Sequence, residues 1–143
     1  MQNFLPNAAM VELHVDDFAV VKDFYGMLGF ETLWETAPDG HHGYLVMRWE
    51  DNVMCFWCGN KLVTTHPYFK DFPGDTRQGY GVEVVLMTKD LDAAYEVFKN
   101  TDAMVEPLKT KPWGLRDFRI KDPYGFYLRV TTVHHIQFPA HSK

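Results

Sequence analysis

Hydrophobic and polar residues alternate most regularly between residues 112 and 130 of this chain. The hydrophobic positions are Phe118, Ile120, Phe126, Leu128 and Val130, and the polar positions between them include Asp117, Arg119, Tyr127 and Arg129. A period of two predicts two strands that bury one face of a sheet and leave the other face bare. The Asp-Pro-Tyr-Gly sequence at 122–125 predicts a tight turn between them, because proline presets φ and glycine tolerates the end of the turn. The bare face must meet solvent, a partner or a ligand.

The pattern of the remaining residues predicts one strand, one helix and three strands in each half of the chain. In the first half these are a strand at 9–15, a helix capped by Asp16 or Asp17 and ended by Gly29, and strands at 30–36, 44–50 and 53–58. In the second half they are a strand at 81–88, a helix capped by Asp90, a strand at 104–109 and the two strands within 112–130.

The two halves align with an offset of about 73 residues, which pairs Met10 with Glu83, Asp17 with Asp90 and Phe56 with Arg129. We therefore expect an α+β fold in one domain, residues 1–143, with two βαβββ modules at about 9–59 and 81–132. The bare faces of the two modules are expected to pair into a curved sheet that encloses a cleft, with the helices outside. The connection at 60–80 is long for a loop and is expected to be functional or to join the modules.

Composition and charge exclude several classes of partner. The net charge of -5 argues against nucleic acid as a partner, and no hydrophobic run is long enough to cross a membrane. The N-terminus lacks a basic region followed by an apolar one, so we expect a cytoplasmic protein. Cys55 and Cys58 form a C-x-x-C pair, but residues three apart on a strand point to opposite faces, so we interpret them as two reduced cysteines.

Two pairs of motifs resemble those of a known superfamily. The residues are Asp17-Phe-Ala-Val-Val-Lys-Asp-Phe-Tyr25 with Leu28-Gly-Phe30, and Pro112-Trp-Gly-Leu-Arg116 with Asp122-Pro-Tyr-Gly125. From about Met10 to Thr132 the chain resembles the vicinal oxygen chelate superfamily, which includes glyoxalase I, extradiol dioxygenases and bleomycin resistance proteins. The second pair of motifs is most similar to the bleomycin resistance branch. The resemblance also implies a homodimer whose clefts lie at or near the interface.

Metal-using members of the superfamily carry His, Gln or Glu at the cleft-facing position of the first and last strand of each module. Transferred to this sequence, those positions are Met10, Phe56, Glu83 and Arg129. Of these, Glu83 alone offers a suitable ligand atom, because arginine stays protonated and phenylalanine has no lone pair. The resemblance therefore implies a protein without metal or other cofactor at this site.

Other polar residues of the expected cleft leave two interpretations open. Arg129 and Glu83 lie on neighbouring strands, and they either neutralise each other or orient a polar group of a ligand. Glu12 and His14 share the bare face of the first strand. They are surface residues without a function, or they contact a ligand, or they form an unusual metal-binding triad together with Glu83. Tyr44, Phe56, Trp113 and Tyr127 are expected to line the cleft with rings, unless they pack on each other or fill a dimer interface.

We expect a metal-independent protein of the bleomycin resistance type that sequesters an aromatic or cationic organic ligand, with no catalytic residues. The expected ligand-binding residues are Met10, Glu12, His14, Tyr44, Phe56, Glu83, Trp113, Tyr127 and Arg129. Two alternatives stay open. The first is a metal-dependent lyase, isomerase or dioxygenase that uses Glu12, His14 and Glu83, and the second is a structural or regulatory dimer whose cleft its own side chains fill.

Overall fold

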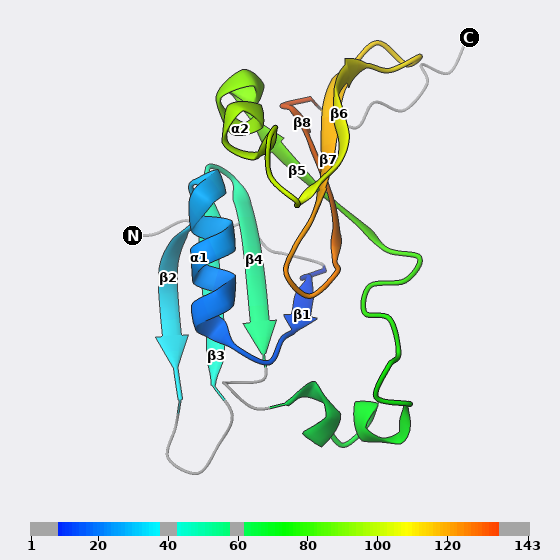
Figure 1. Cartoon of the computed structure of the whole chain (residues 1–143). Coiled ribbons are helices and arrows are strands. Elements are labelled where there is room, and N and C mark those ends of the chain that lie inside the picture. The colour runs from blue at the N-terminus through cyan, green and yellow to red at the C-terminus, as the bar shows by residue number, and fades with distance from the viewer. Residues whose placement is uncertain (1–8, 38–42, 58–61, 135–143) are drawn as a thin grey trace, which may run out of the picture.

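The computed structural model describes residues 9–37, 43–57 and 62–134, and it contains two four-stranded sheets with one helix each (Figure 1). The first sheet has the strand order β1-β4-β3-β2. Its module comprises β1 (Glu12–His14), α1 (Phe18–Leu28), β2 (Glu31–Thr36), β3 (Tyr44–Trp49) and β4 (Asn52–Trp57). β1 pairs with β4 in parallel, and the other two strand pairs are antiparallel.

The second sheet repeats this arrangement with the strand order β5-β8-β7-β6. Its module comprises β5 (Glu83–Thr88), α2 (Leu91–Phe98), β6 (Met104–Thr110), β7 (Arg116–Lys121) and β8 (Tyr127–Thr132). β5 again pairs with the last strand in parallel. The α+β class and the two βαβββ modules predicted from the sequence are confirmed. Cys58, which belongs to the predicted end of the first module, lies outside the described residues.

Side-chain capping explains where the helices begin. Asp17 has an extended backbone and its carboxylate accepts a hydrogen bond from Ala19 N at 2.8 Å, which satisfies one unpaired donor of the first turn. Asp90 accepts from Ala93 N at 3.1 Å at the start of α2. α1 ends at Gly29, whose φ of 117° suits glycine, and a Cβ there would lie 2.9 Å from the Trp49 ring. The predicted caps are therefore confirmed.

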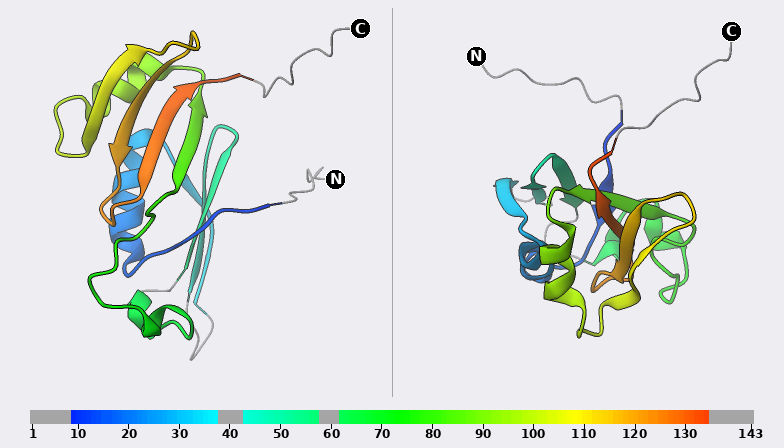
Figure 2. Two further views of the ribbon diagram at one scale, coloured as in Figure 1. Left: turned by 90° about the vertical axis from the view of Figure 1, so that its right-hand side faces the viewer. Right: turned by 90° about the horizontal axis from the view of Figure 1, so that it is seen from above.

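The two modules share a single hydrophobic core. Buried side chains of α1 and α2 meet between the sheets, where the rings of Phe24 and Phe98 lie 5.3 Å apart. Figure 2 shows that each helix covers the face of its own sheet that turns toward the other module. The opposite face of each sheet carries no helix, and we call these the open face of the first sheet and the open face of the second sheet.

Strand pairing in the described residues stays within each module, and the two open faces turn to different sides of the chain (Figure 2). One chain therefore does not bring its two open faces together around a common cleft. A cleft that is enclosed by both kinds of open face stays a prediction, and it is considered below together with the dimer.

A buried hydrogen bond joins the two modules at the centre of the core. The Tyr25 hydroxyl, on α1, donates to Asp122 Oδ2 at 2.8 Å, and both side chains are buried. The other carboxylate oxygen accepts from the backbone N–H groups of Tyr124 and Phe126, both at 2.9 Å. Asp122 thus fixes the turn between β7 and β8 and anchors that turn to the helix of the other module. The sequence predicted the turn but not its long-range partner.

The connection between the modules packs along β1. It contains two short 3-10 helices, η1 (Val63–Thr65) and η2 (Phe69–Asp71). Val63 N donates to Asp16 Oδ1 at 2.6 Å, and Gln78 Nε2 donates to the carbonyl oxygen of His14 at 3.2 Å. The connection therefore covers one end of β1 and belongs to the packed structure.

Replacing Tyr25 with phenylalanine removes the donor to Asp122 and leaves a buried carboxylate less well satisfied. We expect the Tyr25→Phe variant to lose about 1–2 kcal/mol of the free energy of unfolding, as measured by urea denaturation. Tyr68→Phe is the matched control, because Tyr68 is exposed, and its change should stay within about 0.5 kcal/mol. Equal effects of the two substitutions would contradict the role given to the Tyr25–Asp122 hydrogen bond.

Candidate functional site

The open face of the first sheet joins three of the predicted site residues in one hydrogen-bonded group. The Tyr44 hydroxyl donates to Glu12 Oε2 at 2.7 Å, and the other oxygen of Glu12 lies 3.5 Å from His14 Nε2. Glu12 and His14 belong to β1, and Tyr44 belongs to β3. The three side chains share one face of the sheet because side chains alternate between the two faces along each strand. Burial and the hydrogen bond to Glu12 raise the pKa of Tyr44, so its hydroxyl stays protonated and donates.

Aromatic rings surround His14. The imidazole centroid lies 5.3 Å from the Trp57 ring, 5.0 Å from the His66 ring and 5.0 Å from the Phe69 ring. The His14 Nδ1 atom is buried and has no hydrogen-bond partner within the residues that the structure describes. Burial lowers the pKa of His14, and although Glu12 acts in the opposite direction, the imidazole is favoured in its neutral form. His66 and Phe69 belong to the connection, which the sequence did not place against this residue.

The structure corrects the predicted position of Phe56. Its side chain is fully buried and packs on Tyr25, with ring centroids 5.1 Å apart, so it faces the core instead of the open face. In the strand register Glu12 lies opposite Cys55, whereas Val85 lies opposite Arg129. The repeat offset is therefore 73 at the first strand of each module and 74 at the last. A shift of one residue turns a strand side chain to the other face, so Cys55 is the counterpart of Arg129.

The open face of the second sheet carries a network of ion pairs centred on Arg119. Arg119 Nε lies 3.0 Å from Glu83 Oε1, and its Nη1 lies 2.7 Å from Asp117 Oδ1 and 3.3 Å from Glu106 Oε2. Lys111 also pairs with Glu106. The predicted partner of Glu83, Arg129, lies farther away, with its Nε at 4.0 Å. The sequence reasoning missed Arg119 as the main partner of Glu83, because two arginines share this face and the local sequence does not show which of them reaches the carboxylate.

The other predicted site residues are spread over the two open faces. Met10 precedes β1 and is exposed, while Trp34 of β2 is exposed and lies 6.0 Å from the Tyr44 ring. Trp113 is exposed in the loop before β7. Tyr127 begins β8 on the same side as Arg129, and burial raises the pKa of its hydroxyl. The structure therefore brings together Glu12, His14 and Tyr44 on one sheet, and Glu83 and Arg129 on the other.

The residues at the superfamily's metal positions do not fit a metal ion. These positions offer the thioether of Met10, the buried thiol of Cys55, the carboxylate of Glu83, which already pairs with Arg119, and the guanidinium of Arg129. Permanent positive charge at Arg129 opposes a cation, and the donor set mixes ligands that suit different metals. Among the described residues, no three His, Cys, Asp or Glu side chains lie close enough to hold an ion, which includes the considered triad of Glu12, His14 and Glu83.

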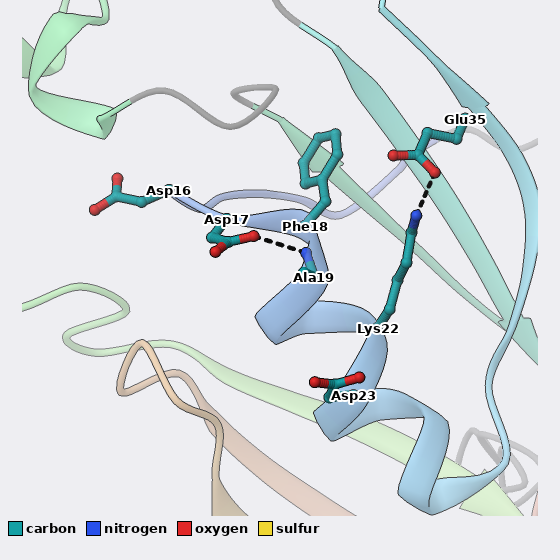
Figure 3. Close-up of a pocket in the computed structure, with 7 residues that line it drawn as sticks. All are labelled: Asp16, Asp17, Phe18, Ala19, Lys22, Asp23 and Glu35. Carbon is teal, nitrogen blue, oxygen red and sulfur yellow. Dashed lines mark hydrogen bonds and ion pairs between the residues drawn. The ribbon is translucent and has the colours of Figure 1, made fainter.

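A separate depression lies at the start of α1, on the helix side of the first sheet. Figure 3 shows that Asp16, Asp17, Lys22, Asp23 and Glu35 border it. Its charges are already used, because Asp17 caps α1 and Lys22 pairs with Glu35. It lies away from both open faces, so we assign it no part in the site. None of the described helices has the length and hydrophobicity needed to cross a membrane.

Comparison with known proteins gives one family and several similar folds. The sequence model described as the Glyoxalase/Bleomycin resistance protein/Dioxygenase superfamily matches residues 7–130. A search of curated proteins gives no match. Among solved structures, TioX from Micromonospora sp. ML1 has a TM-score of 0.63 and 21% identity, and the match covers 92% of this chain and 100% of that one.

Two further solved structures have the same fold. A bleomycin-binding protein complexed with bleomycin has a TM-score of 0.56 and 20% identity, with 90% of this chain and 100% of that chain covered. A superfamily member from Sphaerobacter thermophilus DSM 20745 has a TM-score of 0.63 and 21% identity, with 89% and 98% covered. At these identities the likeness shows the fold alone.

The half-buried imidazole of His14 should make stability depend on pH. Folding lowers the pKa of His14, so as the pH falls the unfolded chain binds a proton at this imidazole before the folded chain does. This difference destabilises the folded state, and it is absent at pH values well above the unfolded pKa, which is near 6.5. The destabilisation grows as the pH falls from there toward the lowered pKa. As the pH falls from about 7.5 to about 5.5, the free energy of unfolding of the His14→Gln variant should therefore rise relative to that of wild type, as measured by urea denaturation. A difference that does not change with pH would contradict the assignment.

Proposed function

Because the chain belongs to the glyoxalase/bleomycin resistance protein/dioxygenase superfamily, we propose that it binds a small organic molecule without using a metal ion. The observation that carries this proposal is the side-chain content of the open faces. They present aromatic rings and charged groups, while the superfamily's metal positions hold Met10, Cys55 and Arg129 beside Glu83. Such surfaces bind by shape, stacking and charge, which are the usual contributions in small-molecule sites.

The open face of the first sheet suits an aromatic or cationic group. Trp34 and Tyr44 form a ring surface on β2 and β3, and Glu12 holds a carboxylate beside it. A cation above these rings would be attracted both by the ring faces and by the Glu12 charge. Glu12 accepts a hydrogen bond from Tyr44, so its carboxylate keeps a fixed position while a ligand binds.

We propose that the functional unit is a homodimer in which the two kinds of open face meet across the interface. Met10, Trp34 and Trp113 are large side chains that are more than half exposed in the single chain, with exposed fractions of 62%, 53% and 57%. Exposed aromatic residues of this kind are typical of interfaces and ligand sites. The first sheet of one chain opposite the second sheet of its partner would enclose the cleft predicted from the sequence. The solved bleomycin-binding protein complexed with bleomycin supports the capacity of this fold to hold an organic molecule.

A metal-dependent lyase, isomerase or dioxygenase is not favoured, because the residues of this chain at the expected metal-binding positions do not fit a metal ion. An enzyme remains the second candidate through the geometry of His14, whose neutral imidazole has an unpartnered Nδ1 and lies beside Glu12. Such an imidazole would act as a general base only after the ring turned one nitrogen toward a bound substrate, because Nδ1 is buried and Nε2 faces Glu12. Turnover of a bound ligand that is lost in the His14→Gln variant would favour this candidate over simple binding.

We expect a cationic aromatic probe to raise the melting temperature, since it binds the folded state alone. A suitable series is 2-naphthylmethylamine with the neutral 2-naphthalenemethanol, which has the same ring and no charge. The amine should raise the melting temperature more than the alcohol, and the Glu12→Gln variant should lose most of that difference. Glu31→Gln is the matched control, because Glu31 is an exposed residue of β2 outside the hydrogen-bonded group.

The size of the protein in solution is a second check of the same proposal. Light scattering after gel filtration should give twice the mass of the 16.7 kDa chain. A monomer that binds neither probe would contradict both the dimer and the binding function. A dimer that binds neither probe would favour a structural role in which the side chains of the chain itself fill the cleft.

A further inference from the structure

The open face of the second sheet contains a hollow of about 340 Å³ that none of the roles above explains. Its walls come from β7, from β8, from the loop before β7 and from the segment after β8. The lining residues are Trp113, Leu115, Asp117, Arg129, Thr131 and His134. Its chemistry differs from that of the first sheet, because it is lined by the cation Arg129, whereas the open face of the first sheet presents the carboxylate of Glu12.

Two arginines lie directly opposite each other on this face. Arg119 of β7 and Arg129 of β8 are partners in the antiparallel register, and like charges in such pairs repel. The nearby carboxylates are divided unequally between them. Arg119 contacts Glu83, Asp117 and Glu106, whereas the described part of the chain places one carboxylate within 4.0 Å of Arg129, that of Glu83. The Glu83 oxygen at that distance is the same one that accepts from Arg119 at 3.0 Å.

Arg129 is therefore the less compensated cation of the pair. Its Nε atom is buried and has no hydrogen-bond partner among the described residues, which is costly for a group that stays charged at all ordinary pH values. The other acid in the hollow does not supply the missing charge. Asp117 is 1% exposed and is held by Arg119 at 2.7 Å and by Lys111 at 3.8 Å, so its carboxylate is already compensated.

The remaining walls suit a flat group beside an anion. The Trp113 ring is 57% exposed at the rim of the hollow and offers a surface for stacking. His134 Nδ1 lies 2.9 Å from the carbonyl oxygen of Thr132, and since a carbonyl can only accept, this nitrogen carries the proton. The imidazole is thereby held in one orientation at the side of the hollow.

We propose that this hollow binds the carboxylate of an aromatic or otherwise flat organic acid, with Arg129 as the anion-binding residue and Trp113 as the stacking surface. A guanidinium matches a planar carboxylate with two parallel N–H groups, which gives both charge and direction. The inference rests on the proposed function, in which the second sheet forms one wall of the ligand site. Together with the acidic first sheet, it defines the ligand as a molecule that carries a cationic or aromatic part and a separate carboxylate.

The test uses 2-naphthoate, which has the same ring as the naphthyl amine and alcohol but a negative charge. Binding is followed by NMR on 15N-labelled full-length protein, through the indole N–H signal of Trp113, which the Trp113→Phe variant identifies. We expect 2-naphthoate to shift this signal at lower concentration than either of the other two probes. Inorganic phosphate is added in a separate titration, so that a general anion site is distinguished from a carboxylate site.

The variants separate the charge of Arg129 from its shape. Arg129→Gln should weaken 2-naphthoate binding by about tenfold or more, and Arg129→Lys should recover part of it, because lysine keeps the charge but not the planar fork. Both variants are expected to fold, because Arg129→Gln relieves the repulsion between the opposed arginines and Arg129→Lys keeps a charge that the fold already accommodates. Arg116→Gln is the matched control, since Arg116 is on β7 but pairs with Asp92 of α2 and should leave binding unchanged.

The outcomes distinguish failure of this inference from failure of the proposed function. If the amine and alcohol bind but 2-naphthoate does not, or binds equally to wild type and Arg129→Gln, the carboxylate site is wrong while the binding function stands. If phosphate binds as well as 2-naphthoate, the hollow holds anions in general and the assignment to a flat carboxylate is wrong. If no probe binds at any concentration up to the solubility limit, the binding function itself is contradicted.

Discussion

The structure depends on one constraint, which is that two helices from different modules are buried in a single core. A four-stranded sheet with one helix can bury only one of its faces, and α1 and α2 bury the two inner faces against each other. The Tyr25–Asp122 hydrogen bond fixes this arrangement, because it joins α1 to the turn between β7 and β8. As a consequence both outer faces stay open, and the residues on them are free to serve binding.

The two open faces lie on different sheets and carry different charged side chains. The first sheet gathers Glu12 with aromatic rings, and the second gathers arginines around Glu83. At Glu83, a position that the sequence resemblance assigns to a metal ligand, the structure holds a carboxylate that the guanidinium of Arg119 already binds. Arg119 is the buried member of this pair, and its charge would be costly there without a carboxylate partner. The guanidinium of Arg119 would repel a metal ion bound at Glu83. This is why we favour binding of a ligand without a metal ion.

Much of the fold was predictable from the sequence, because periodicity and capping are local signals. Asp17, Asp90 and Gly29 marked the helix ends. The alternation within 112–130 correctly placed Phe118, Ile120 and Leu128 in the core, but Asp117 and Arg119 on the opposite face are buried as well. Phe56 was placed on the wrong face because the repeat offset changes by one residue along the module, and a period of two turns that small error into a reversal. Local patterns cannot reveal such a shift.

The candidate site was less predictable because its contacts are long-range. Nothing in the local sequence shows that Arg119, and not Arg129, takes Glu83, or that His66 and Phe69 from the connection enclose His14. These positions depend on strand register and on the path of the connection, which only the folded chain determines.

The most direct test of the central claim is to measure ligand affinity and metal content on the same preparation. The protein is purified without chelator, its Fe, Mn, Ni and Zn are determined, and the affinity of 2-naphthylmethylamine is measured before and after treatment with EDTA. Metal-independent binding predicts far less than about one metal ion per chain and an affinity that EDTA leaves unchanged. About one tightly bound ion per chain, with binding lost in EDTA and restored by adding that ion back, would contradict the account.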